Sequence, residues 1–177
     1  LTPNRADCAG LRGIARDLAA AGMGKLKPLK AENVKGDYKS AVNVSIEANQ
    51  ECPIFLGRMI KNVENKPSPA WMQQRLKAVG LRPISALVDI TNYVSMDLCR
   101  PLHVFDADKL AGNINVRMGN VGEELNGLND KSYKISESMT VVADDSGALA
   151  LGGIVGGVET GCTPETKNVF VECAYFD

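Results

Sequence analysis

The stretch 82–106 constrains the fold most, because it carries a long apolar pattern and then ends it sharply. Its apolar residues recur at helical spacing, at Leu87, Ile90, Val94 and Leu98. Ser85 before them is a suitable N-cap, whereas Pro101 after them cannot continue a helix. The pattern therefore predicts a helix that closes before Pro101. The β-branched residues within it leave a buried strand open as the alternative.

The same stretch holds polar residues that could serve a site. Thr91 and Asn92 put a hydroxyl and an amide into an otherwise apolar run. If buried, they need hydrogen-bond partners; if they line a pocket, they are ready to contact a ligand. His103 is the single histidine of the chain, and its ordinary pKa is the only one suited to proton transfer at neutral pH.

The remaining segments alternate between helical and strand periodicity. Helices are predicted over 4–22 and, between the N-cap Ser68 and the terminating Gly80, over a stripe of Trp71, Met72, Leu76 and Val79. Strands are predicted over 42–46, 53–63, 114–118, 139–143 and 168–176. These elements follow no regular βαβ rhythm. The predicted class is therefore α+β, with mixed or antiparallel sheets flanked by helices.

Four features allow two interpretations each. Trp71 is either core, which the stripe favours, or a platform for a ligand. The lysines of 25–39 form either a solvated linker, which is favoured, or a weak phosphate-facing edge. The glycine pairs of 148–157 are either a packing device or the wall of a ligand site, and they lack the spacing of a dinucleotide fingerprint. Glu172, inside an apolar strand, either faces solvent or is held there for a purpose.

Composition narrows the class of protein. An apolar fraction of 45% is typical of globular chains, and no apolar run is long enough to cross a membrane. Five scattered cysteines without a Cys-x-x-Cys pair indicate reduced thiols in a cytoplasmic protein and argue against structural zinc. A net charge of −1 excludes a strongly basic nucleic-acid surface, though not a local patch. The first residue is not Met, and we expect an excised piece of a longer chain.

Taken together, six short segments in order resemble one known family. They are LTPNRAD (1–7), RGIARDL (12–18), VDITNYV (88–94), PLHVFD (101–106), LALGGIVGG (149–157) and VECAYF (171–176). They are similar to the editing domain of the β subunit of bacterial phenylalanyl-tRNA synthetase, a B3/B4-type domain. The resemblance covers 1–177.

The resemblance implies hydrolysis of the ester that links a wrongly attached tyrosine to the tRNA for phenylalanine. It implies that Glu172 accepts the phenolic O–H, that Gly153 and Gly156 leave room for the aminoacyl group, and that His103 lies near the ester. Thr91 and Asn92 would contact the aminoacyl-adenosine end.

Arg82 would lie near the same cleft. The implied partners are tRNA and the synthetase α subunit of the full heterotetramer, with no membrane. No metal or other cofactor is implied for this domain, since the full synthetase uses ATP and magnesium elsewhere.

The sequence departs from the family pattern at a few positions. Cys99 and Arg100 stand where Gly-Gln is usual, Ala86 where Asn is common, and Val104 where Ala is common. The family pocket also draws on a His-Thr-Asp-Ala-Ser segment that would follow Asp177. Two hypotheses remain: a hydrolytic editing domain, and a non-catalytic module that binds or orients tRNA.

Overall fold

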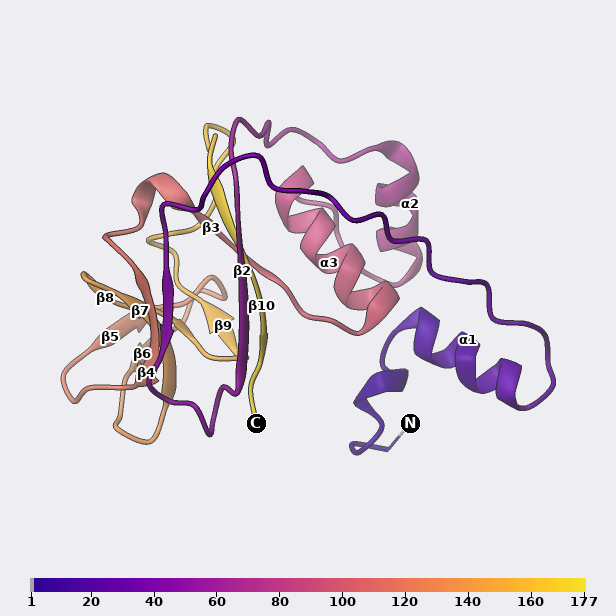
Figure 1. Ribbon diagram of the computed structural model, residues 1–177, viewed down its shortest axis with the longest axis horizontal. Coiled ribbons are helices and arrows are strands. Elements are labelled where there is room, and N and C mark those ends of the chain that lie inside the picture. Colours follow the sequence, from indigo (N-terminus) through magenta and orange to yellow (C-terminus); the bar gives the residue numbers. More distant parts are fainter. Residues whose placement is uncertain (1) are drawn as a thin grey trace.

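The computed structural model describes residues 2–177 and arranges them as one lobe of packed sheets and one lobe of helices (Figure 1). The helices are α1 (Leu11–Ala20), α2 (Ala70–Ala78) and α3 (Ala86–Leu98), with two short 3₁₀ turns, η1 (Ala6–Cys8) and η2 (Ala107–Lys109). The long segment between α1 and the first strand crosses from the helical lobe to the sheets (Figure 1). The predicted α+β class is confirmed.

A five-stranded sheet forms one layer of the sheet lobe, in the order β1-β4-β7-β8-β9. Its strands are β1 (Val44–Ile46), β4 (Ile114–Met118), β7 (Thr140–Asp144), β8 (Gly147–Leu151) and β9 (Val155–Gly156). Only the β1–β4 pair is parallel, and the other neighbours run antiparallel. The sheet is therefore mixed, as the sequence predicted.

A three-stranded antiparallel sheet forms the facing layer, in the order β2-β10-β3. Its strands are β2 (Ile54–Ile60), β10 (Val169–Tyr175) and β3 (His103–Asp106). A small hairpin of β5 (Glu124–Asn126) and β6 (Ser132–Lys134) completes the lobe. The last strand in the sequence is central here, and it places Glu172 between the other two strands.

The main core lies between the two layers. Phe105 of β3 and Phe170 of β10 are register partners and pack against Ile114, Val142 and Leu149 of the larger sheet. A second cluster lies on the other face of that sheet, where the β5–β6 hairpin covers it with Leu125, next to Ile135, Val141, Ala143 and Leu151. Apolar side chains on both faces of β7 and β8 therefore fix these strands, and the turn that follows β8, in place.

Helix α3 settles the alternative left open for 82–106. Ser85 is its N-cap position with extended backbone, and the helix ends at Cys99, whose φ of 51° is left-handed. The buried carboxylate of Asp89 accepts hydrogen bonds from the Ser68 hydroxyl and, at 2.8 Å, from the Ile84 N–H. This buried carboxylate ties the first turn of α3 to the segment before α2. The stretch is therefore a helix, and the strand alternative is wrong.

The prediction of one helix over 4–22 is wrong in detail. The segment divides into η1 and α1, with Gly10 at the N-cap position of α1. A Cβ at Gly13 would overlap the backbone of Asp7, so the absence of a side chain lets η1 fold back onto the first turn of α1.

The predicted stripe of α2 is half right. Met72 and Leu76 are buried, but Trp71 is 50% exposed and Val79 44% exposed. The stripe is narrower than predicted because α2 packs against α3 and makes few contacts with the sheets. The core interpretation of Trp71 is therefore wrong.

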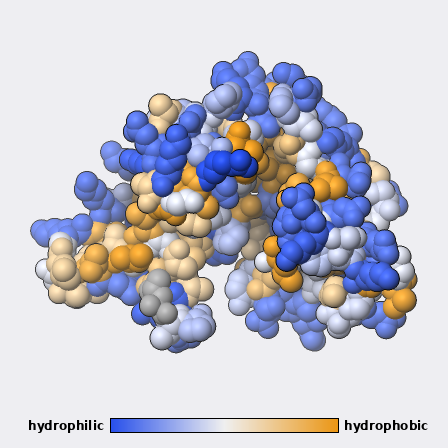
Figure 2. All heavy atoms as spheres, turned by 180° about the vertical axis from the view of Figure 1, so that it is seen from behind, coloured by the Kyte–Doolittle hydropathy of each residue, from blue (hydrophilic) through white to orange (hydrophobic). Residues whose placement is uncertain are grey.

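Seen from behind, apolar side chains gather around a hollow between the lobes (Figure 2).

Candidate active site

A cleft of about 540 Å³ opens where the three-stranded sheet meets the glycine-rich turn between β8 and β9. It is lined by residues 100–103, 150–156 and 174–177, together with Val142 and Glu172. The structure thus brings together His103, Gly153, Gly156 and Glu172, which are four of the seven residues that the sequence proposed.

Glu172 reaches this cleft because of strand register. On β10 it lies opposite His103 of β3 on one side and Gly57 of β2 on the other. It is 7% exposed, so the solvent-facing alternative is excluded. Burial raises the pKa of its carboxyl to about 7, because the charged form loses its hydration. Near neutral pH this side chain can therefore donate or accept a hydrogen bond.

Gly57 lies in the middle of β2, and the pairing with β10 runs through it without a break. A Cβ at this position would overlap the ring of Phe170. The glycine therefore lets an aromatic ring lie over the strand beside Glu172.

His103 begins β3, immediately after the loop that leads out of α3. Its ring packs edge-on against Phe105, with centroids 4.4 Å apart and planes at 76°. Nε2 is buried and has no hydrogen-bond partner among residues 2–177. Burial also lowers the pKa of the imidazole to about 4, so the ring is neutral at physiological pH. Because Nε2 lies against Gly156 and is closed to water in this conformation, the ring must turn before this unpaired nitrogen can hold a water molecule or a polar substrate atom.

The glycines of the turn accept close approach by aromatic rings. A Cβ at Gly156 would overlap Cε1 of His103 and lie 2.8 Å from Nε2. A Cβ at Gly152 would lie 2.6 Å from Cε1 of Phe176, and Gly153, with φ of 69°, is left-handed as well. The glycines therefore serve as a packing device and also form a wall of the cleft, and contact of that wall with a ligand stays a prediction.

The other three predicted residues lie elsewhere. Thr91 and Asn92 are on α3, and the Thr91 hydroxyl donates to the Val88 carbonyl at 2.8 Å. Arg82 lies exposed in the connection between α2 and α3. None of the three lines the cleft. Their contacts with an aminoacyl-adenosine end stay a prediction.

Phe176 and Arg100 are among the lining residues that sequence reasoning missed. Phe176 was part of a quoted segment, but its position over the glycine turn depends on the crossing of β10 and β8, which no local pattern reveals. Arg100 was noted only as a departure from the family. No sequence signal marked it, because the left-handed φ of Cys99 before it is known only from the structure.

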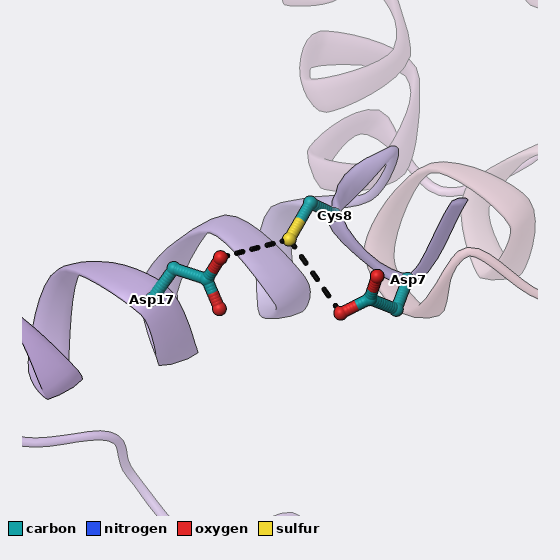
Figure 3. A group of neighbouring side chains, drawn as sticks. All are labelled: Asp7, Cys8 and Asp17. Carbon is teal, nitrogen blue, oxygen red and sulfur yellow. Dashed lines mark hydrogen bonds between the residues drawn. The ribbon is translucent and has the colours of Figure 1, made fainter. Parts of the chain in front are cut away.

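A second cluster of possible ligand atoms lies at the start of α1. Asp7, Cys8 and Asp17 bring such atoms within 4.8 Å of one another (Figure 3). Arg5 and Arg16 form ion pairs with both carboxylates. These bonds lower the pKa of Asp7, and the hydrogen bond from the Cys8 thiol, followed by the two arginines, lowers the pKa of Asp17. Since two guanidinium groups already neutralise the carboxylates, we interpret the cluster as a link between η1 and α1. We assign no metal to it.

The comparisons with known proteins agree with this architecture. Residues 51–177 match the family model of the B3/4 domain. The phenylalanine–tRNA ligase β subunit of Paramagnetospirillum magneticum is 58% identical over 181 residues, and that of Ruegeria pomeroyi is 53% identical over 179 residues. Each match covers the whole of this chain but only 23% and 22% of the respective relative.

A crystal structure of an N-terminal fragment of the phenylalanyl-tRNA synthetase β subunit from Pyrococcus horikoshii has a similar fold. The TM-score is 0.58 at 18% identity, over 98% of this chain and 53% of that one. Within residues 2–177, none of the helices combines the length and hydropathy that a membrane span requires.

Proposed function

Because the chain belongs to the B3/4 domain family, we propose that it is the proofreading part of a phenylalanine–tRNA ligase. In this role it hydrolyses the ester of tyrosine wrongly attached to the tRNA for phenylalanine. The observation that carries the proposal is the buried carboxyl of Glu172 beside the neutral His103, in a cleft with apolar walls.

The need for such a site follows from the two amino acids. Tyrosine is phenylalanine with one added hydroxyl, and an apolar pocket rejects an added hydroxyl by only on the order of 100-fold. A second site that hydrogen-bonds this hydroxyl prefers tyrosine over phenylalanine, the reverse of the preference of the apolar pocket. Phenylalanine in that site would leave a buried polar group unpaired, which costs about 1–3 kcal/mol.

Glu172 has the properties that this sorting requires. Its ionised form accepts from the phenol, and its protonated form also offers a donor. No other side chain among residues 2–177 hydrogen-bonds to its carboxyl, so a ligand does not have to displace one.

In hydrolysis, water attacks the ester carbonyl and the terminal ribose hydroxyl leaves with a proton. The role proposed for His103 is to orient that water or to move its proton through Nε2. No Ser, Thr or Cys side chain hydrogen-bonds to its ring within the described residues, so direct attack by water fits better than a covalent intermediate. The implied macromolecular partners are tRNA and the α subunit of the ligase.

One observation favours the second candidate, a non-catalytic module that orients tRNA. His103 lies against Gly156 and Phe176 lies over Gly152, so aromatic rings fill the space that the glycines leave. Saturable binding of tyrosine in preference to phenylalanine supports the editing site. Binding of tRNA with no preference between the two amino acids supports the alternative.

The decisive tests are deacylation of tyrosyl-tRNA by the complete ligase that contains this domain, and the binding of tyrosine and of phenylalanine to the same protein. Glu172→Ala should weaken tyrosine binding roughly 5- to 150-fold, the equivalent of a lost hydrogen bond of about 1–3 kcal/mol, and leave phenylalanine binding nearly unchanged. Glu165→Ala, on an exposed loop, serves as the matched control. Equal losses for the two amino acids would remove Glu172 from its proposed role.

A further inference from the structure

Trp71, Arg75 and Tyr93 form a cluster outside the cleft. The rings of Trp71 on α2 and Tyr93 on α3 meet edge to face, with centroids 5.4 Å apart. The Arg75 guanidinium lies 5.3 Å from the Trp71 centroid and 5.9 Å from that of Tyr93. It also donates to the Tyr93 hydroxyl at 2.5 Å. The cation is therefore held in one place against both rings.

This cluster is open on one side. Half of the Trp71 surface is exposed, although an indole ring is costly to leave in water. Figure 1 shows α3 between the sheets and α2, so α2 lies at the outer margin of the helical lobe. The sheet core, which buries the phenylalanines, does not extend to this ring.

The helix α2 and the connection after it carry positive charge. Residues 69–88 contain Arg75, Lys77 and Arg82 and no aspartate or glutamate, whereas α3 carries the buried Asp89 and, further along, Asp97. A polyanion is therefore attracted to this helix, whereas a neutral or basic protein surface is not.

We propose that Trp71, Arg75 and Tyr93 form a stacking site for an unpaired base of single-stranded RNA. Unpaired bases stack on aromatic side chains and on arginine planes, while nearby cations attract the phosphates. Trp, Tyr and Arg are also the residues that dominate protein interfaces. The cations of α2 and of the connection after it favour RNA over a protein partner. The site is separate from the cleft and does not depend on tyrosine hydrolysis.

The chain contains a single tryptophan, so its intrinsic fluorescence reports on this ring alone. Titration of the 177-residue chain with a short single-stranded oligoribonucleotide should quench that fluorescence saturably. The same sequence as a duplex, or inorganic polyphosphate of equal charge, should leave it nearly unchanged. Quenching by polyphosphate to the same extent would mean charge binding without stacking, and would overturn the proposal.

Variants separate stacking from charge, with binding followed by the anisotropy of a labelled oligoribonucleotide. Trp71→Ala should weaken binding roughly 5- to 150-fold and Trp71→Phe distinctly less. Lys77→Ala is the matched control from the same helix. It should reduce the salt dependence of binding, by about 0.7 in the log–log slope if Lys77 meets a phosphate, and leave the fluorescence change intact. Thermal unfolding of each variant checks that the fold persists.

Two results would refute the site. One is binding of the oligoribonucleotide with equal affinity by the wild type and Trp71→Ala. The other is complete protection of Trp71 from acrylamide in the full ligase without RNA, since the cluster would then be a protein interface.

Discussion

The two lobes differ in how far they bury their own apolar residues. In the sheet lobe, Phe105 and Phe170 are 0% and 1% exposed. In α1, by contrast, the apolar residues at helical spacing, Leu11, Ile14 and Leu18, are 54%, 46% and 44% exposed. Strands that pack across two layers bury the faces between the layers, whereas a helix held by a single neighbour leaves most of its stripe open. The core between the sheets is therefore closed, although Ile54 and Leu56 of β2 are 55% and 62% exposed, and this lobe contains the cleft.

The largest expected effect tests this contrast directly. Phe105→Ala should lower the free energy of unfolding by about 3–5 kcal/mol, because it leaves a cavity in the core between the sheets. Leu18→Ala should lower it by only about 0.5 kcal/mol or less. Chemical denaturation of both variants gives the two values. Similar losses would show that α1 belongs to the same cooperative core as the sheets.

A second prediction concerns the two titrating groups of the sheet lobe. The pKa of Glu172 rises from 4.5 to about 7 on folding, so its contribution to stability is present below pH 4.5 and is lost as the pH rises through 7. The pKa of His103 falls from 6.5 to about 4, so its contribution is present above pH 6.5 and is lost as the pH falls through 4. Each contribution to the free energy of unfolding amounts to about 3 kcal/mol. Between pH 4.5 and 6.5 the two contributions change with pH in opposite directions and cancel.

Single variants should reveal the pH dependence of stability that each of the two groups contributes. In Glu172→Gln, the free energy of unfolding should rise from pH 4 to 6.5, because only His103 titrates. In His103→Gln, it should fall from pH 4.5 to 7. The other charged or titratable residues that line the cleft, Arg100, Tyr175 and Asp177, are common to both variants. If both variants kept the flat profile of the wild type, the two pKa values would not be shifted as described.

A third prediction concerns Gly156, which packs directly against the His103 ring. Even the Cβ of Gly156→Ala overlaps the His103 ring, so the ring must move. We expect a loss of stability of about 1–3 kcal/mol and, in the complete ligase, at least a tenfold slower deacylation of tyrosyl-tRNA. The matched control is Gly36→Ala, where the nearest atom would be 3.8 Å away. Unchanged deacylation by Gly156→Ala would show that the position of His103 is unimportant.

The sequence predicted five of the ten strands and all three α-helices of the described residues, but not which helix faces are buried. Period-two alternation located β4, β7 and β10 to within about a residue, because both layers bury what the pattern marks as apolar. The same logic failed for Trp71 and for the face of α1, because periodicity marks an apolar stripe and not whether a neighbour covers it.

For the candidate site, the sequence identified single residues but not which of them lie together. Glu172 was recognisable as a charge inside an apolar strand, and its partner His103 as the single histidine. That the two lie opposite each other depends on strand register, which only the fold determines. For the same reason Phe176 went unnoticed, since it reaches the glycine turn through the packing of two different sheets.

The smallest expected effect concerns Arg100, the one cationic residue among those that line the cleft. If the cleft holds the aminoacylated end of a tRNA, the phosphodiester next to the terminal ribose lies close to the ester, and an exposed arginine at the rim is suited to pair with it. Arg100→Gln should raise the KM for tyrosyl-tRNA a few-fold, leave kcat unchanged and reduce the salt dependence of binding by about 0.7 in the log–log slope. A tyrosine ester of adenosine, which has no phosphate, should be hydrolysed equally by the wild type and the variant. A loss of the same size with this small ester would mean that Arg100 shapes the cleft and does not bind phosphate. The cleft of the sheet lobe would then make no phosphate contact through Arg100, in contrast to the RNA site proposed for the helical lobe.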